Sequence, residues 1–195
     1  MRKITVINQV TLDGVTQAPA SPEEDTRGGF EHGGWAMPNV DPVMGEAMGK
    51  RMAAGEGCLL FGRWTYESLY EAWHVHRPED PMTARLESSR KYVVSSTLTE
   101  PLVWANSTLL SGDAGDAVAE LKQEPGPDIG MLGSGELIHA LMARGLIDGL
   151  VLLIHPLVLG SGRRLFEGGE QPAEFGLTDS VITTTGVVIA TYERR

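Results

Sequence analysis

Three short segments of the chain place glycine or serine directly after an apolar run. They are residues 58–68 (CLLFGRWTYES), 92–96 (YVVSS) and 129–137 (IGMLGSGEL). Where such a run is a strand and a helix follows, the first amides of the helix point outward and attract phosphate. Parallel strands bring such turns to one edge of a sheet, where open α/β folds bind their ligands. The three segments together therefore predict a nucleotide-cofactor site.

The overall charge of the chain limits the ligands that it can attract. Its 26 acidic and 16 basic residues give a formal net charge of −10. Nonspecific binding of nucleic acid is not expected, because it depends on lysines and arginines that release counterions from the phosphates. An anionic cofactor would need local basic groups, and Arg63 and the Arg163–Arg164 pair are the candidates.

The number of cysteines and the length of the apolar runs indicate the cellular compartment in which the protein is expected. The single cysteine, Cys58, lies within an apolar run, so no internal disulfide can form and a small core residue is predicted. No apolar run reaches the length of a membrane span. We therefore expect a soluble cytoplasmic protein with no membrane partner. His74 and His76 have the spacing of metal ligands, but without cysteines or a carboxylate-rich context surface histidines are favoured, and no metal is expected.

Apolar patterning predicts one α/β domain over residues 1–195. Strand patterns alternate with helical patterns, which is typical of a mixed, mainly parallel sheet flanked by helices. Two last strand patterns separated by Thr185–Gly186 predict a closing antiparallel hairpin. The expected strands are 3–10, 58–61, 91–95, 102–104, 129–132, 150–155, 174–184 and 187–193. The expected helices are one that opens at Asp41–Pro42, with Asp41 as its N-cap, and those at 65–73, 82–89, 113–122 and 136–144.

Residues 16–40 differ in character from the rest of the chain. They hold Pro19, Pro22, Pro38, four glycines and an acidic cluster at 23–25, without a periodic apolar pattern. A segment of this length inside a compact domain is usually functional or mobile. Its aromatic residues lie among glycines, which favours a flap over a linker. Trp35 is therefore a candidate substrate contact that covers the site as the flap closes; the alternative is that it anchors the loop.

The same segments resemble, in order, the motifs of one fold family. Residues 62–68 (GRWTYES) resemble the Gly-Arg-x-Thr-Trp/Tyr-Glu-Ser segment of dihydrofolate reductases, 93–96 (VVSS) their strand-Ser-Ser element, and 132–135 (LGSG) their triple-glycine phosphate turn. Asp13–Gly14 and residues 156–166 are more similar to the reductase domain of the bifunctional riboflavin-biosynthesis deaminase/reductase and its stand-alone bacterial relatives. The Pro-Cys-x-x-Cys motif of the deaminase half is absent. The resemblance spans essentially the whole chain and implies a three-layer fold like that of dihydrofolate reductase.

The resemblance also implies that NADPH is the cofactor and that these turns hold it. Gly62 would let the backbone approach the pyrophosphate, with the amides of Trp64 and Thr65 pointing at it. Arg63 would bind the ribose 2′-phosphate, which favours NADPH over NADH. The other implied cofactor residues are Ser95, Ser96, Gly133, Ser134 and Gly135. Each motif alone has an alternative interpretation, in which the glycines end strands and Arg63 is a solvated surface charge.

Two further residues, Gln9 and Glu46, are candidates for contact with the nicotinamide and with the substrate. Gln9 falls where the first strand would pass the nicotinamide, and its backbone could hold the carboxamide. Glu46 matches, counted without gaps, the carboxylate that dihydrofolate reductases place beside the pterin, so it is the candidate catalytic proton source. Helical spacing gives the alternative: Glu46 lies opposite the apolar stripe of Met44 and Met48, as a solvent-facing residue would.

Together these observations predict an NADPH-dependent reductase that transfers a hydride to a small heterocycle. The substrate would be a ribosylaminopyrimidine of the riboflavin pathway, similar to 5-amino-6-(5-phosphoribosylamino)uracil, or a pterin similar to dihydrofolate. The alternative is a non-catalytic nucleotide-binding dimer of the same fold that acts as a sensor or scaffold. The resemblance also implies a homodimer.

Overall fold

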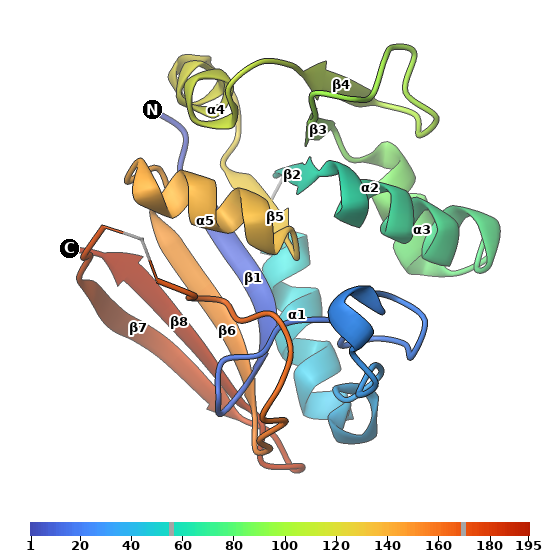
Figure 1. The fold of residues 1–195 in the computed structure, drawn as a ribbon, viewed down its shortest axis with the longest axis vertical. Coiled ribbons are helices and arrows are strands. Elements are labelled where there is room, and N and C mark those ends of the chain that lie inside the picture. The colour runs from blue at the N-terminus through green and yellow to red at the C-terminus, as the bar shows by residue number, and fades with distance from the viewer. Residues whose placement is uncertain (55–56, 169–170) are drawn as a thin grey trace.

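The computed structural model describes residues 1–54, 57–168 and 171–195, which form an eight-stranded sheet with helices on both faces (Figure 1). The strand order is β4-β3-β2-β5-β1-β6-β8-β7. The strands are β1 Ile4–Thr11, β2 Cys58–Gly62, β3 Lys91–Val94, β4 Ser107–Leu110, β5 Ile129–Leu132, β6 Gly149–His155, β7 Phe175–Ile182 and β8 Val188–Arg194. The helices are α1 Pro42–Ala54, α2 Arg63–Leu69, α3 Pro81–Ser88, α4 Ala114–Gln123 and α5 Gly135–Ala143, with a π-helical turn at Tyr70–Val75 after α2.

The strand pairing confirms the predicted mixed sheet. The pairings among β4, β3, β2, β5, β1 and β6 are parallel, and β8 runs antiparallel to both β6 and β7. The closing hairpin is thus confirmed. The predicted strand at 102–104 is wrong, because the apolar run there serves packing instead: Trp104 is buried in a cluster with Phe61 and Tyr66, and β4 follows later.

Alternate residues of the strands face two different cores. Ile4 and Val6 of β1 pack with Leu141 of α5, on the face that α4 and α5 cover. On the opposite face, Met44 of α1 packs on β6 and β8, and Phe61 of β2 packs under α2 and α3. Each buried side chain of this size contributes about 1.5–3 kcal/mol. Both cores therefore fix the strand ends from which the turns after β2 and β5 depart.

The chain leaves two neighbouring strands, β2 and β5, in opposite directions. From β2 it passes through α2 and α3 to β3, and from β5 it passes through α5 to β6, which lies on the other side of the sheet order. The helices that follow the two strands lie on opposite faces. In open α/β sheets a crevice forms at the carboxyl ends of such a strand pair, and ligands bind there.

Residues 16–40, which we call the flap, form an irregular but packed segment. They contain two 3-10 turns, at Arg27–Gly29 and Met37–Asn39. Phe30 and Trp35 are buried together with Val15, which precedes the flap, against residues that follow β6. A Cβ at Gly33 would lie 2.6 Å from the Cα of Pro22, so the flap also packs closely against itself.

Candidate functional site

The turns after β2 and β5 are joined by two hydrogen bonds. The backbone N–H of Gly62 donates to Ser134 Oγ at 3.0 Å, and the backbone N–H of Ser134 donates to Thr65 Oγ1 at 2.9 Å. Ser134 Oγ in turn donates to the carbonyl oxygen of Leu132. The two hydroxyl groups therefore fasten together the two turns that the sequence predicts to bind phosphate.

The second turn uses a backbone conformation that glycine favours. Gly133 has φ of 55°, and Ser134, which carries a side chain, has φ of 63°. A Cβ at Gly133 would lie only 3.2 Å from the side chain of Thr65. The left-handed conformation of Ser134 costs about 1–3 kcal/mol, and such strain is concentrated at ligand-binding and catalytic positions. Its two hydrogen bonds to the neighbouring turn hold Ser134 in place.

The helices that follow these turns begin without a side-chain cap. Gly62 precedes α2 and Ser134 precedes α5, and at neither position does a side-chain oxygen accept a hydrogen bond from a first-turn amide. The amides of an uncapped first turn have no intrahelical partner and carry the positive end of the helix dipole. The two turns therefore offer two groups of amide donors that an anion could bind. The other α-helices each begin with a capping aspartate: Asp41, Asp80 and Asp113.

Gly62 lies where the two turns approach each other. Its φ of −78° and ψ of 161° are open to any residue, so the backbone does not require glycine. A Cβ there would lie in ordinary contact, 3.8 Å from the Cβ atoms of Leu137 and Ser134. At Gly135 a Cβ would meet nothing within 4 Å. Amides, hydroxyls and open space fit the pyrophosphate of a dinucleotide.

Arg63 lies at the rim of this cradle and is held in place by two partners. Its Nη1 donates to Thr97 Oγ1 at 2.7 Å, and its Nε lies 3.1 Å from the carboxylate of Glu67. Ser95 is buried, and its Oγ accepts hydrogen bonds from backbone amides of the same loop. Ser96 is exposed. Ser95 thus shapes the loop that carries Thr97, while Arg63 and Ser96 remain accessible to a phosphate.

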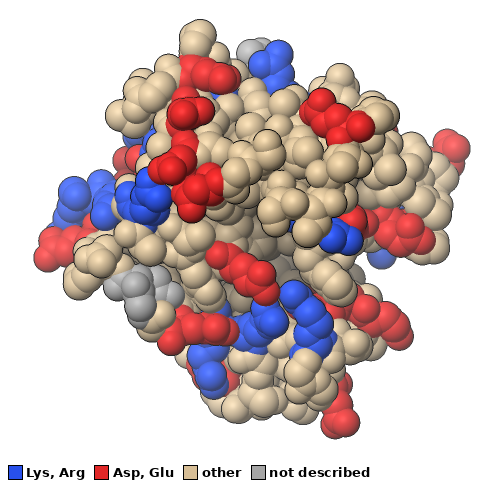
Figure 2. All heavy atoms as spheres, turned by 45° about the horizontal axis from the view of Figure 1, so that its top comes forward, with Lys and Arg blue, Asp and Glu red and all other residues tan. Residues whose placement is uncertain are grey.

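Two further arginines lie beside the turn at the start of α5. The guanidinium of Arg27 stacks on the ring of Trp64, 4.5 Å from its centroid, and contacts the carboxylate of Glu136 at 3.4 Å. Arg163 contacts the same carboxylate. Asp25 binds the other side of Arg27. The cations near the crevice are thus balanced by carboxylates, and Figure 2 shows basic and acidic side chains interspersed over this view of the surface.

Gln9 lies at the carboxyl end of β1, beside the departure of the chain from β5. Pairing between β1 and β5 ends at Ile7 and Leu132, whereas pairing between β1 and β6 continues to Thr11 and His155. Gln9 therefore flanks the turn after β5, and its Oε1 lies 2.5 Å from His155 Nε2. Its contact with a nicotinamide stays a prediction.

Trp35 is anchored in the structure. Its exposed fraction is 8%, and its indole Nε1 donates to the carbonyl oxygen of Gln17 at 2.7 Å. Its ring meets the ring of His155 edge-on, with centroids 5.2 Å apart. These contacts match the anchoring alternative, and contact with a substrate stays a prediction.

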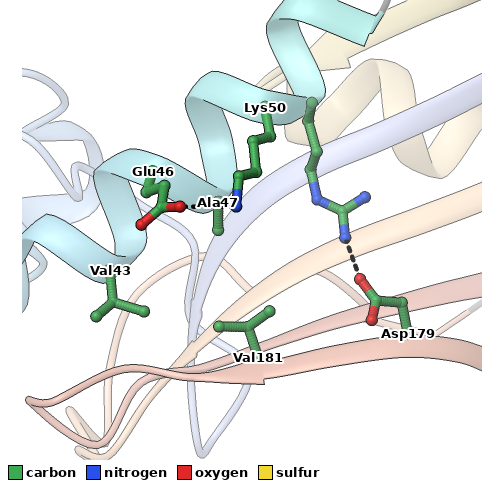
Figure 3. A pocket seen from close by; sticks show the side chains of 7 residues that line it. Val43, Glu46, Ala47, Lys50, Asp179 and Val181 are labelled. Atoms are coloured by element: carbon green, nitrogen blue, oxygen red, sulfur yellow. Dashed lines mark hydrogen bonds and ion pairs between the residues drawn. The ribbon is translucent and has the colours of Figure 1, made fainter.

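Glu46 lies in another part of the molecule, on the side of α1 that faces the edge strand β7. It lines an open groove of about 410 Å³ together with Val43, Ala47, Lys50, Arg51, Asp179 and Val181 (Figure 3). Its side chain is 68% exposed, and its hydrogen bond and ion pair with Lys50, at 2.7 Å, lower its pKa. A proton donor needs the opposite, a desolvated carboxyl with a raised pKa. The surroundings thus match the solvent-facing alternative, and a catalytic role for Glu46 stays a prediction.

Within the described residues, no three His, Cys, Asp or Glu side chains gather as metal ligands would. His74 contacts Glu87, and His76 contacts Glu71. No described helix combines the length and the apolar character that crossing a bilayer requires.

Thr97, Arg27 and Glu136 lie beside the turns and were not predicted from the sequence. Thr97 directly follows Ser95 and Ser96, and Glu136 directly follows Gly135, so an inspection of residues flanking each turn would have found both. No local pattern marks Arg27, because tertiary packing of the flap brings it to Trp64.

Known proteins match the chain in sequence and in fold. Residues 2–189 match the RibD C-terminal domain family. The uncharacterized protein YyaP of Bacillus subtilis is 31% identical over 142 residues, which are 69% of this chain and 72% of that protein. A pyrimidine reductase-like protein of Corynebacterium diphtheriae has a TM-score of 0.62 at 10% identity, over 100% of this chain and 92% of that chain. Dihydrofolate reductase of Enterococcus faecalis, complexed with NADP(H), has a TM-score of 0.60 at 12% identity, over 99% and 96%. The two structures establish a fold like that of dihydrofolate reductase.

Proposed function

The chain belongs to the RibD C-terminal domain family, and from this premise we propose that it is an NADPH-dependent reductase acting on a small heterocycle. The substrate would be a pyrimidine similar to 5-amino-6-(5-phosphoribosylamino)uracil or, as the second choice, a pterin. One observation carries the proposal: the hydrogen-bonded contact between the turns after β2 and β5, where the chain leaves neighbouring strands in opposite directions.

In this proposal the two turns bind the cofactor through its phosphates. The first-turn amides at Trp64, Thr65 and Gly135 would donate to pyrophosphate oxygens, and both helix dipoles would favour the negative charge. Arg63, held by Thr97, would bind the ribose 2′-phosphate through its guanidinium. Ser96, exposed beside it, would add a hydroxyl donor. This arrangement distinguishes NADPH from NADH by a single phosphate.

The residues nearer the end of β1 would orient the reacting rings. Bound NADPH supplies the hydride. Gln9 would hold a ring substituent beside the second turn, and the flap, anchored through Trp35, would keep water out of the crevice. The protein therefore contributes position and solvent exclusion, since hydride transfer needs the two carbons in close and fixed contact.

A titration of the protein with NADPH and with NADH tests the cofactor assignment. We expect saturable NADPH binding that is at least about tenfold tighter than NADH binding, which corresponds to about 1.4 kcal/mol. Absence of saturable binding of either cofactor below about millimolar concentration would end the proposal. Loss of NADPH absorbance on addition of the pyrimidine or the pterin then identifies the substrate class.

The surroundings of Glu46 favour a second candidate, a non-catalytic nucleotide-binding dimer. Its exposed, ion-paired carboxylate does not resemble a proton donor. This candidate predicts NADPH binding without oxidation by either heterocycle, and Glu46→Gln would leave every measured property unchanged. The reductase with Glu46 as donor predicts instead that Glu46→Gln lowers kcat and preserves NADPH affinity. Light scattering after size exclusion measures the proposed homodimer.

A further inference from the structure

Gln9 and His155 form a side-chain pair at the carboxyl edge of the sheet, on neighbouring strands. Gln9 Oε1 lies 2.5 Å from His155 Nε2. His155 is fully buried, whereas Gln9 is partly exposed. A carboxamide oxygen can only accept, so Nε2 of the imidazole carries the hydrogen and donates a hydrogen bond to Gln9 Oε1.

The second ring nitrogen of His155 is buried without a hydrogen-bond partner. Among the described residues, Nδ1 of His155 is the one buried side-chain nitrogen or oxygen atom in this situation. Burial alone lowers the pKa of His155 to about 4, so the ring is neutral at neutral pH. Since an apolar ring would fill the same space without an unsatisfied atom, the bond to Gln9 is the one polar contact that histidine adds.

Trp35, a residue of the flap, fixes the orientation of the His155 ring. The ring of Trp35 meets it edge-on at an interplanar angle of 89°. Trp35 is itself held by its hydrogen bond to the backbone of Gln17. The contacts therefore run in sequence from the flap through Trp35 and His155 to Gln9.

We propose that His155 is a positioning residue: it holds the amide oxygen of Gln9, and the amide –NH2 of Gln9 thereby becomes a fixed donor to a carbonyl oxygen of the bound ring system. The amide is planar, so a fixed oxygen turns the nitrogen away from His155. None of the hydrogen bonds between described residues uses Gln9 Nε2. The register places Gln9 two residues beyond the end of the β1–β5 pairing, next to the second phosphate turn.

The carbonyl oxygen has two possible sources, the carboxamide of the nicotinamide and the heterocyclic substrate. The identity of this ligand rests on the proposed function, whereas the pair itself does not. Both sources present the same chemistry, a carbonyl acceptor beside a flat ring. The arms of the experiment below separate them.

Two substitutions of His155 distinguish positioning from packing. His155→Phe keeps an aromatic ring against Trp35 and removes the donor, while His155→Gln keeps a donor and fills the space less well. We expect His155→Phe to be the more stable variant and to have about tenfold lower kcat/KM than the wild type, with His155→Gln restoring part of the loss. A merely structural role predicts that activity follows stability, with the phenylalanine variant the better enzyme, and that result overturns the proposal.

Binding measurements identify which carbonyl is held. If it belongs to nicotinamide, His155→Phe and Gln9→Leu both weaken NADPH binding about tenfold and leave 2′,5′-ADP binding unchanged, because that fragment lacks nicotinamide. If it belongs to the heterocycle, NADPH binding is unchanged and the KM for the heterocycle rises. Changes below twofold in all three constants overturn the proposal. His74→Phe is the matched control, since His74 also stacks on an aromatic ring, Tyr70, and contacts a side-chain oxygen, of Glu87, away from the crevice.

Nitrogen-15 NMR of the imidazole tests the pair independently of catalysis. We expect the neutral Nε2–H tautomer of His155 from neutral pH down to about pH 5, with slow exchange of that proton. Gln9→Leu would speed the exchange. An Nδ1–H tautomer in the wild type overturns the inference even if NADPH binds. Failure of the wild type to bind NADPH or 2′,5′-ADP would refute the proposed function and would leave the NMR result to decide the pair.

Discussion

Helices α1, α3 and α4 begin with an aspartate whose carboxylate accepts a hydrogen bond from the first turn, whereas α2 and α5 begin with no side-chain cap. The uncapped helices are the two that follow β2 and β5, the neighbouring strands from which the chain departs in opposite directions. A cap satisfies amides within the fold, and its absence leaves them to a ligand. This contrast fits the proposed cofactor site, in which the two uncapped helix ends would bind phosphate and the capped ends would bind no ligand.

Installing a cap at the crevice is the largest perturbation of this contrast. Gly62→Asp gives α2 the aspartate that the other helices have, and the backbone conformation of Gly62 accepts it. The new side chain enters the gap between the turns, and its charge repels phosphate. We expect NADPH affinity to fall at least about 100-fold, which is about 2.7 kcal/mol, with stability unchanged or slightly raised. Titration calorimetry and denaturant unfolding measure the two effects.

Removing the N-cap from one of the capped helices is the matched control. Asp113→Ala deletes the acceptor for the amide of Asp116 at the start of α4. We expect a loss of about 1 kcal/mol in the free energy of unfolding and no change in NADPH affinity. Equal weakening of NADPH binding by Gly62→Asp and Asp113→Ala would show that the uncapped N-terminus of α2 has no particular role in binding the cofactor.

Separating the two turns has the next largest effect. Thr65→Val removes the oxygen that accepts from the backbone N–H of Ser134, so a strained turn loses its support. We expect the free energy of unfolding to drop by about 1–2 kcal/mol and NADPH binding to weaken about tenfold. Thr83→Val in α3 loses a comparable hydrogen bond, to the carbonyl oxygen of Arg77, and serves as control. Equal NADPH affinity in the two variants would contradict the account.

Substitution of Arg63 tests the discrimination between NADPH and NADH. Arg63→Leu removes the guanidinium proposed for the 2′-phosphate but leaves both turns intact. We expect NADPH affinity to fall about tenfold and NADH affinity to stay within about twofold. Arg144→Leu removes another exposed, ion-paired arginine, bound to Asp116, and should change neither constant. A parallel fall for NADH would show that Arg63 acts on the pyrophosphate or on the fold.

Acid should weaken the capped N-terminus of α1, and this is the smallest expected effect. The Thr184 hydroxyl, followed by the amide of Met44, lowers the pKa of Asp41 from its usual 3.8. Stability from this group is therefore present above about pH 4 and is lost as pH falls through the lowered pKa. Asp41→Asn should be less stable than the wild type at neutral pH and should lose less stability on acidification. Unfolding curves at several pH values measure this, and identical acid sensitivity would refute it.

Much of the fold could be predicted from local patterns in the sequence. Strands such as β5 and β6 follow from short apolar runs, and α1 follows from Asp41–Pro42 and the spacing of Met44 and Met48. The prediction of a strand at 102–104 was wrong, because an apolar run alone does not show whether its residues pair with a neighbouring strand or only pack into a core. Trp104 is buried in a cluster with Tyr66, and the strand forms later in the chain, at Ser107–Leu110.

The candidate site was predictable only where its residues follow a strand directly. Gly62, Thr65 and Ser134 could be selected in this way, but the hydrogen bonds that join them depend on β2 and β5 being neighbours. The contacts of Arg27 and His155 arise from the flap and from strand register, over long sequence separations, and no local pattern encodes them.

Amide chemical shifts during an NADPH titration report whether the uncapped helix ends bind the cofactor. We expect large, saturable shifts for the first-turn amides of α2 and α5, at Trp64, Thr65 and Gly135. The capped first turns, at Met44, Met82 and Asp116, should remain unchanged. Saturable shifts at the capped ends, or none at the uncapped pair, would contradict this expectation.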